Sequence, residues 1–131
     1  MKKEQLVRHE FEPVYDKNSE ILILGSFPSV KSREQGFYYG HPQNRFWKVL
    51  AAIVQEKIPD SIEEKKEMLL RNHIAVYDVI WQCKITGSSD SSIKDVVPAD
   101  ITTIVELSKI RKIYANGKLA EKLFSKYQEK K

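Results

Sequence analysis

The sequence predicts a three-layer α/β/α domain with a short, mainly parallel sheet, and two observations lead to that fold class. Three short runs of apolar or β-branched residues, at 21–24, 74–80 and 110–115, predict strands, and the segments between them carry helix-capping residues. The first run, Ile-Leu-Ile-Leu closed by Gly25, is apolar at every position, which is typical of a strand buried on both faces of a parallel sheet.

The segment after the first strand is expected to be a long loop followed by a helix. Residues 25–40 hold Pro28 and two further glycines without a sustained helical period. Asn44 is placed to cap a helix that runs to Val54 and ends before Pro59.

Helices and strands alternate through the second half of the chain. Ser61 and Glu64 form a capping box that opens the second helix, and 74–80 is the second strand. Residues 86–92 are predicted to be a polar loop, and Asp100 caps the short helix that follows.

The third strand, 110–115, ends at Asn-Gly 116–117 and leads into a terminal helix. Parallel sheets of this kind bind ligands outside the carboxyl ends of their strands. The loops expected at that edge are 25–40, 82–92 and 116–117.

Composition narrows the class of protein. The chain has 131 residues, 41% hydrophobic and 31% charged, which favours one soluble domain over 1–131. No apolar run approaches the roughly 18–20 residues of a membrane span, and the charged start lacks the apolar stretch of a secretory signal. The single cysteine, Cys83, excludes an internal disulfide and suits a reducing compartment, so a cytoplasmic location without a membrane partner is expected.

The net charge of +4 is unevenly distributed. Residues 109–131 carry eight Lys or Arg against two Asp or Glu, so the rest of the chain is slightly acidic. Such a basic segment is compatible with a nucleic-acid partner, and equally with the solvated face of a lysine-rich helix.

Several kinds of site are absent from the sequence. It has no dinucleotide-binding glycine motif, no phosphate-binding Gly-Lys-Ser/Thr loop and no Gly-x-Ser-x-Gly elbow. His9, His41 and His73 are isolated, and Cys83 has no partner cysteine, so no metal-ligand spacing exists. We therefore expect no metal or other cofactor.

Two dense motifs carry a family resemblance. Gly-Ser-Phe-Pro-Ser at 25–29 and Tyr-Tyr-Gly-His-Pro-Gln-Asn-Arg-Phe-Trp at 38–47 gather backbone amides, aromatic rings and polar groups beside the first strand. In these motifs the chain resembles the hypoxanthine-DNA glycosylase family of the uracil-DNA glycosylase superfamily. Weaker matches follow in order at 78–83, 87–93 and 116–120.

The resemblance implies a DNA partner and a reaction. It implies hydrolysis of the N-glycosidic bond of a deaminated base, hypoxanthine first and uracil second, after the nucleotide has been flipped out of the stack. Cleavage leaves positive charge on the sugar and negative charge on the base, so the site needs an oriented water, donors and a stacking surface. A monofunctional enzyme is expected, because the motif segment holds no lysine beyond Lys31.

The resemblance also implies which residue holds the water. Elsewhere in the superfamily an Asp or Asn often stands just before the proline of the first motif, where this chain has Phe27. The role then passes to Asn44, whose amide oxygen can orient water. The alternative for Asn44 is helix capping, and both roles can hold together.

The remaining roles that the resemblance implies concern the base and the DNA backbone. The expected base-binding residues, through stacking, backbone amides or polar tips, are Gly25, Ser26, Phe27, Tyr39, His41 and Asn116. The expected phosphate contacts are Ser29, Ser88, Ser89, Ser91 and Lys118. Alternatives stay open: Asn116 as a helix cap, Tyr39 and His41 packing on Trp47, and a merely solvated serine loop. Trp47 and Trp81 are expected in the core.

The family continues beyond the terminal helix with another strand and a Ser-rich DNA-gripping loop. The chain is therefore expected to be C-terminally incomplete, with the last strand missing, and to be a monomer when complete. Two other functions remain open: a non-catalytic nucleic-acid or nucleotide-binding α/β domain, and an α/β scaffold of some other hydrolase.

Overall fold

Two three-stranded sheets form the framework of the molecule in the computed structural model, which describes residues 4–9, 11–40, 44–87 and 89–127. The parallel sheet has the order β3-β2-β6, and its strands are β3 (Ile74–Asp78), β2 (Ile21–Gly25) and β6 (Lys112–Ala115). The antiparallel sheet has the order β1-β4-β5, and its strands are β1 (Glu4–Arg8), β4 (Ile80–Thr86) and β5 (Lys94–Pro98).

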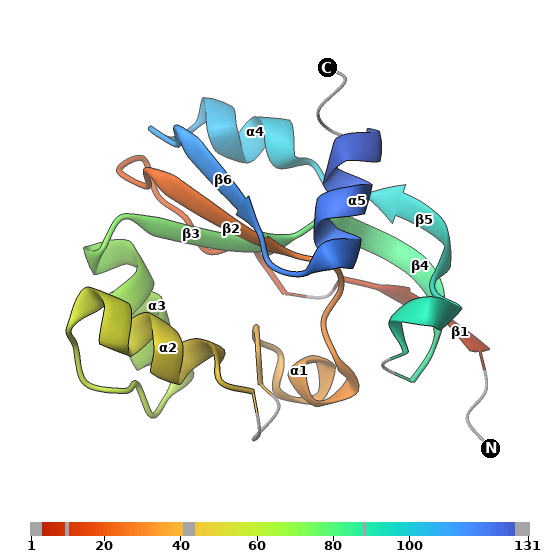
Figure 1. Cartoon of the computed structure of the whole chain (residues 1–131), viewed down its shortest axis with the longest axis horizontal. Helices are drawn as coiled ribbons and strands as arrows, with labels where there is room; N and C mark the ends of the chain where they lie inside the picture. The colour runs from red at the N-terminus through yellow and green to blue at the C-terminus, as the bar shows by residue number, and fades with distance from the viewer. Residues whose placement is uncertain (1–3, 10, 41–43, 88, 128–131) are drawn as a thin grey trace.

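Helices cover both faces of the parallel sheet. The connection from β2 to β3 contains α1 (Val30–Gln35), α2 (Phe46–Val54) and α3 (Ile62–Arg71), whereas α4 (Ile101–Glu106) precedes β6 and α5 (Lys118–Tyr127) follows it. The connection from β2 to β3 and the later connection from β3 to β6 cross the sheet in opposite directions, so right-handed crossovers place their helices on opposite faces. Figure 1 shows α2 and α3 on one side of the sheet and α4 and α5 on the other, which confirms the three-layer class.

The core follows the apolar pattern of the sequence. On one face of β2, Leu22 and Leu24 are fully buried, and on the other Ile21 and Ile23 are half-buried. Every residue of the neighbouring strand β3 is buried, so the central strand is covered on both faces as predicted, more completely on the face of Leu22 and Leu24. Trp47 lies in the core as expected. The expectation was wrong for Trp81, which is 38% exposed and stacks under the Arg8 guanidinium at 5.6 Å.

The antiparallel sheet was not expected. The second predicted strand does not stop at Ile80 but continues as β4 to Thr86, so only part of the expected loop 82–92 lies outside a strand. Buried Cys83 and Ile85 alternate there with more exposed polar residues, a period-two pattern typical of a half-buried strand. The short 3₁₀ helix η1 (Asp90–Ser92) completes the turn into β5.

The loop expected over 25–40 contains a helix. Ser29 caps α1 by accepting a hydrogen bond from the Ser32 amide at 3.2 Å, and Gly36 ends the helix with φ at 73°. A helix of six residues shows too little periodicity to be found from sequence alone.

Three predicted caps have different outcomes. Ser61 accepts from the Glu64 amide at 3.1 Å, and Asp100 accepts from the Thr103 amide at 3.1 Å, as expected. Arg45, and not Asn44, occupies the N-cap position of α2. In the described part of the chain, no helix combines the length and apolar character that a membrane span requires.

Candidate active site

A cavity of about 220 Å³ opens at the carboxyl end of β2. The neighbours of β2 in the sheet, β3 and β6, are reached by crossovers in opposite directions, so this end of β2 is the point at which open α/β sheets bind ligands. The volume is smaller than the roughly 300–1,000 Å³ of pockets that hold drug-sized ligands, and is therefore suited to a smaller group.

The cavity brings together most of the residues that the sequence singled out. Seven of them line it: Gly25, Ser26, Phe27, Ser29, Tyr39, Asn44 and Asn116. His41 and Ser88 lie outside the described residues. Lys118 is exposed at the start of α5 and does not line the cavity.

The described serines of the polar loop 86–92 do not line the cavity. Ser89 and Ser91 are exposed, with their hydroxyl oxygens 3.0 Å apart. The guanidinium of Arg33 on α1 donates to the carbonyl of Gly87 at 2.7 Å, which fixes the start of this loop to the helix behind the first motif.

Gly25 leaves room for two polar groups at the end of β2. A β-carbon at this position would collide with Oδ1 of Asp78 and would lie 3.2 Å from the phenol oxygen of Tyr39. The missing side chain therefore allows a carboxyl group and a phenol to approach the strand end together.

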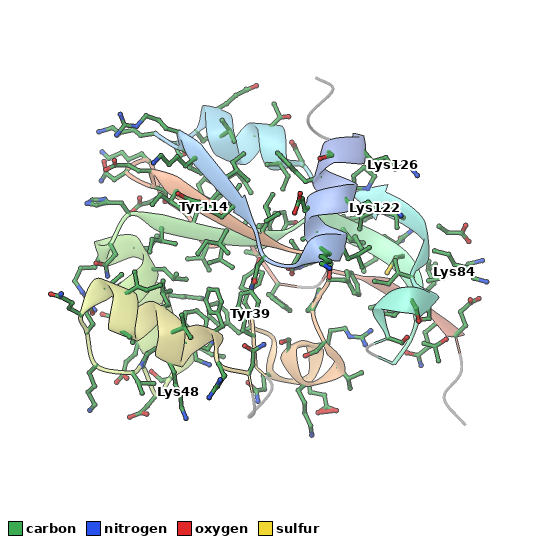
Figure 2. The ribbon with its side chains drawn as sticks, viewed as in Figure 1. Tyr39, Lys48, Lys84, Tyr114, Lys122 and Lys126 are labelled. Carbon is green, nitrogen blue, oxygen red and sulfur yellow. The ribbon has the colours of Figure 1, made fainter. Side chains whose placement is uncertain are left out.

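Tyr39 is held in an unusual conformation at the cavity. Its φ of 52° lies in the left-handed region, which non-glycine residues rarely adopt and which is often found at functional sites. Its ring stacks on Phe46 with centroids 3.9 Å apart, and Nδ2 of Asn116 donates to its phenol oxygen at 3.2 Å. Figure 2 shows Tyr39 between α2 and the turn from β6 into α5.

The phenol of Tyr39 keeps its proton. Burial raises the pKa of Tyr39 above its ordinary value, and the nearby charge of Asp78 raises it further. Since Asn116 supplies the hydrogen bond that the phenol oxygen accepts, the phenol proton remains available for donation.

Asn44 lines the cavity with an exposed side chain. Its Oδ1 accepts a hydrogen bond from the Phe46 amide at 2.8 Å, so it secures the start of α2 from the position before the N-cap. An amide oxygen has two lone pairs, and the second can accept from a water.

Phe27 has contacts on both sides of its ring. The ring is half-buried and packs against the core, and its edge approaches His9 at a centroid distance of 6.2 Å. The Arg33 guanidinium lies 5.8 Å from the ring centroid. Phe27 therefore combines a core contact with a place in the cavity wall.

The sequence assigned no role to Asp78, which also lines the cavity. Its Oδ2 lies 2.7 Å from Nε2 of His9, and the two side chains are 5% and 0% exposed. The partners stand 69 residues apart, so no spacing in the sequence signals the pair. Asp78 also adds to the effect of burial on Tyr77 and raises the pKa of Tyr77 to about 12.

No group of three or more His, Cys, Asp or Glu side chains within the described ranges is placed to hold a metal ion. The chemical groups that line the cavity include backbone amides, serine hydroxyls, the side-chain amides of Asn44 and Asn116, tyrosine phenols, the carboxyl group of Asp78 and the ring of Phe27.

Comparisons with known proteins agree with one another. The uracil DNA glycosylase superfamily matches residues 12–131. A hypoxanthine DNA glycosylase of Methanosarcina acetivorans is 38% identical over 117 residues, which cover 88% of this chain and 74% of the relative. The protein of the same name from Methanosarcina barkeri is 37% identical over 110 residues, which cover 82% of this chain and 70% of the relative.

A solved structure has the same fold. It is the solution NMR structure of a Methanosarcina acetivorans protein studied as a candidate uracil DNA glycosylase. It is 36% identical in sequence, its TM-score is 0.79, and the match covers 93% of this chain and 78% of that chain.

Proposed function

This chain belongs to the uracil DNA glycosylase superfamily, and we propose that it is a DNA glycosylase that hydrolyses the bond between a deaminated base and its deoxyribose in DNA. The base proposed first is hypoxanthine, because two relatives that are 38% and 37% identical to this chain over the aligned residues carry its name. Uracil is proposed as the second base, since it bears the same lactam N–H and carbonyl.

The observation that carries the proposal is the convergence of three separate segments of the chain on one small cavity. Phe27 comes from the turn after β2, Asn44 from the segment before α2 and Asn116 from the end of β6, yet all three line the same space. A base flipped out of the duplex needs such a closed, polar site with an aromatic wall.

In the proposed reaction, Phe27 stacks on the flipped base and Asn44 holds the attacking water through the second lone pair of Oδ1. As the glycosidic bond breaks, its electron pair moves into the base and positive charge develops at the sugar C1′. The water oxygen then bonds to C1′ and releases its proton to solvent. The backbone amides near Gly25 and Ser26 and the phenol of Tyr39 are the donors proposed to stabilise the base as it acquires negative charge.

The lysines of α5 are proposed to bind the DNA backbone. Lys118, Lys122 and Lys126 are exposed and follow one another at intervals of four residues, so they share one face of the helix. Figure 2 shows Lys122 and Lys126 on α5, the helix that begins beside the cavity residue Asn116. Ser29, Ser89 and Ser91 are proposed as further phosphate contacts.

We also propose that residues 1–131 belong to a single domain, that the complete protein is a monomer, and that it acts in the cytoplasm. The two sheets share one buried core, and Cys83 is a buried free thiol, which suits a reducing compartment. Light scattering during size exclusion would contradict the monomer if it gave twice the mass expected for the chain.

The test of the function is a cleavage assay for abasic sites. The protein is incubated with a duplex that holds one deoxyinosine and with the matched deoxyadenosine duplex, and strand breaks are measured after alkali. Breaks confined to the deoxyinosine duplex are expected. DNA binding without breaks would overturn the glycosylase and favour a non-catalytic nucleic-acid-binding domain.

A further inference from the structure

Both ring nitrogens of His9 face hydrogen-bond acceptors, one of which is the cavity residue Asp78. Nδ1 lies 3.0 Å from the carbonyl oxygen of Phe11, and Nε2 lies 2.7 Å from Oδ2 of Asp78. The rings of Phe11, Tyr77 and Tyr38 surround the imidazole at centroid distances of 4.6, 5.0 and 5.7 Å. The imidazole is 0% exposed, so water cannot replace either contact.

This arrangement determines where the protons lie. A carbonyl oxygen only accepts, so Nδ1 of His9 must carry a proton. A second proton must lie between Nε2 and Oδ2, because two lone pairs 2.7 Å apart would repel each other. Whether Nε2 or Oδ2 holds that proton, Oδ2 is engaged in the hydrogen bond to His9. Oδ1 of Asp78 then carries no proton and can only accept a hydrogen bond.

The second oxygen of the carboxyl group, Oδ1, is the one left to face a ligand. Among the described residues, the hydrogen bonds of the Asp78 side chain engage Oδ2 only, and Asp78 lines the cavity although its side chain is 5% exposed. Oδ1 stands so close above Gly25 that a β-carbon there would collide with it. The carboxyl group is therefore anchored on one oxygen and offers the other to a ligand.

We propose that His9 makes Asp78 a permanent hydrogen-bond acceptor and thereby selects bases that carry a ring N–H, an inference that rests on the proposed function. Deamination turns the ring nitrogen lone pair of adenine N1 or cytosine N3 into an N–H. Oδ1 of Asp78 can accept a hydrogen bond from that N–H. In adenine or cytosine the same ring nitrogen carries a lone pair, which would be repelled by the lone pairs of Oδ1. His9 is a positioning residue in this scheme, since it acts through Asp78.

Loss of His9 removes this constraint. Oδ2 then faces no donor, so the carboxyl group can turn away and Oδ1 is no longer held in place to accept from the N–H of the base. The preference for a base with a ring N–H over adenine is reduced as a result. Sites built to pair with a substrate N–H discriminate against analogues without it by about 10⁴-fold, so even partial loss of the acceptor is measurable.

The test compares single-turnover excision from deoxyinosine and deoxyadenosine duplexes. His9→Phe is expected to lower the hypoxanthine-to-adenine ratio at least tenfold. His9→Gln retains a donor for Oδ2 and is expected to keep the ratio within a few-fold of wild type. Tyr77→Phe is the matched control, because it keeps the ring that packs on His9 and is expected to leave the ratio unchanged.

Asp78→Ala keeps the test valid if His9→Phe fails to fold. The substitution removes the acceptor Oδ1 itself and leaves the His9 ring in the chain. Hypoxanthine excision is expected to fall sharply, and the hypoxanthine-to-adenine ratio is expected to fall with it. An unchanged ratio in folded His9→Phe or Asp78→Ala protein would overturn the inference.

Two further measurements separate this inference from the proposed function. Long-range ¹H–¹⁵N correlation of the His9 ring is expected to show a protonated Nδ1, and an unprotonated Nδ1 would overturn the inference. If wild type excised no base, the proposed function would fail. In that case the binding of free hypoxanthine and of free adenine would be measured from the shifts of the backbone amide signals. Wild type is expected to bind hypoxanthine more tightly than adenine, and His9→Phe is expected to lose this preference. A preference retained in His9→Phe would overturn the inference.

Discussion

Asn116 and Tyr39 meet across the mouth of the cavity, where Nδ2 of Asn116 donates to the phenol oxygen of Tyr39 at 3.2 Å. The backbone amide of Asn116 also donates to the carbonyl of Leu24 at 2.6 Å, which fixes Asn116 to the end of β2. The bond thus ties a strained residue of the second motif to the central sheet, although the two residues lie 77 positions apart.

The first prediction follows from that bond. Tyr39→Phe removes both the acceptor of Asn116 and the phenol proposed as a donor to the base, but keeps the stacking on Phe46, so excision is expected to fall about 10²-fold, the effect of losing one donor to the departing base. A double-mutant cycle with Asn116→Ala checks it. Additive losses in the cycle would show that the pair does not act as a unit.

The second prediction concerns the water. Asn44→Ala is expected to reduce excision about 10²-fold or more, because the oriented water is lost. The Phe46 amide loses its acceptor at the same time, at a cost of about 1 kcal/mol in the free energy of unfolding. Single-turnover excision and thermal melting are measured on the same sample, and a folded variant that excises at the wild-type rate would refute the role.

The third prediction separates stacking from packing at Phe27. Base–aromatic stacking is worth roughly 1–3 kcal/mol, so Phe27→Ala is expected to weaken both DNA binding and excision, and Phe27→Tyr to keep most of each. Because the ring also packs on the core, urea unfolding is measured for both variants. If Phe27→Ala unfolds the domain outright, the ring is primarily a core residue.

The parts of the fold that the sequence predicted are those in which local pattern and burial agree. The continuous apolar run of β2 indicates a buried strand, and Ser61 and Asp100 cap helices that begin at the next residue, so in each case the signal lies in the segment itself. Strands β1 and β5 are mostly exposed and take their shape from pairing with β4, a neighbour distant in sequence. Tertiary pairing of this kind leaves little local signal.

The same reasoning applies to the candidate site. The two dense motifs were found because they stand together in the sequence and follow a buried strand. His9 looked isolated, since its partner Asp78 is 69 residues away and the two are joined only when β1 pairs with β4. The backbone amide of His9 donates to the Trp81 carbonyl at 2.7 Å, so the unexpected sheet is what brings the imidazole to the cavity residue Asp78.

The fourth prediction concerns DNA binding by α5. Lys122→Gln together with Lys126→Gln is expected to weaken binding to any duplex sequence and to reduce the salt slope of log K by about 2. Lys48→Gln is the control, because Figure 2 places Lys48 on α2, far from α5 in the view. Fluorescence anisotropy at several salt concentrations measures both, and an equal loss with Lys48→Gln would mean that net charge alone drives binding.

The last prediction uses two glycines with different surroundings. Gly25→Ala would press a β-carbon against Oδ1 of Asp78, which His9 holds from the other side, and against the phenol of Tyr39 at 3.2 Å. Overpacking of this kind costs about 1–3 kcal/mol of stability, and the carboxyl group must leave the position that the base requires.

The control is Gly36→Ala, whose β-carbon would meet nothing within 4 Å, although the φ of 73° at this position makes alanine unfavourable by about 1 kcal/mol or more. Both variants are therefore expected to lower the melting temperature, while only Gly25→Ala abolishes excision of hypoxanthine. Melting curves and single-turnover rates for the pair check this, and excision by Gly25→Ala at the rate of Gly36→Ala would show that the approach of Asp78 to the strand end is not needed for the reaction.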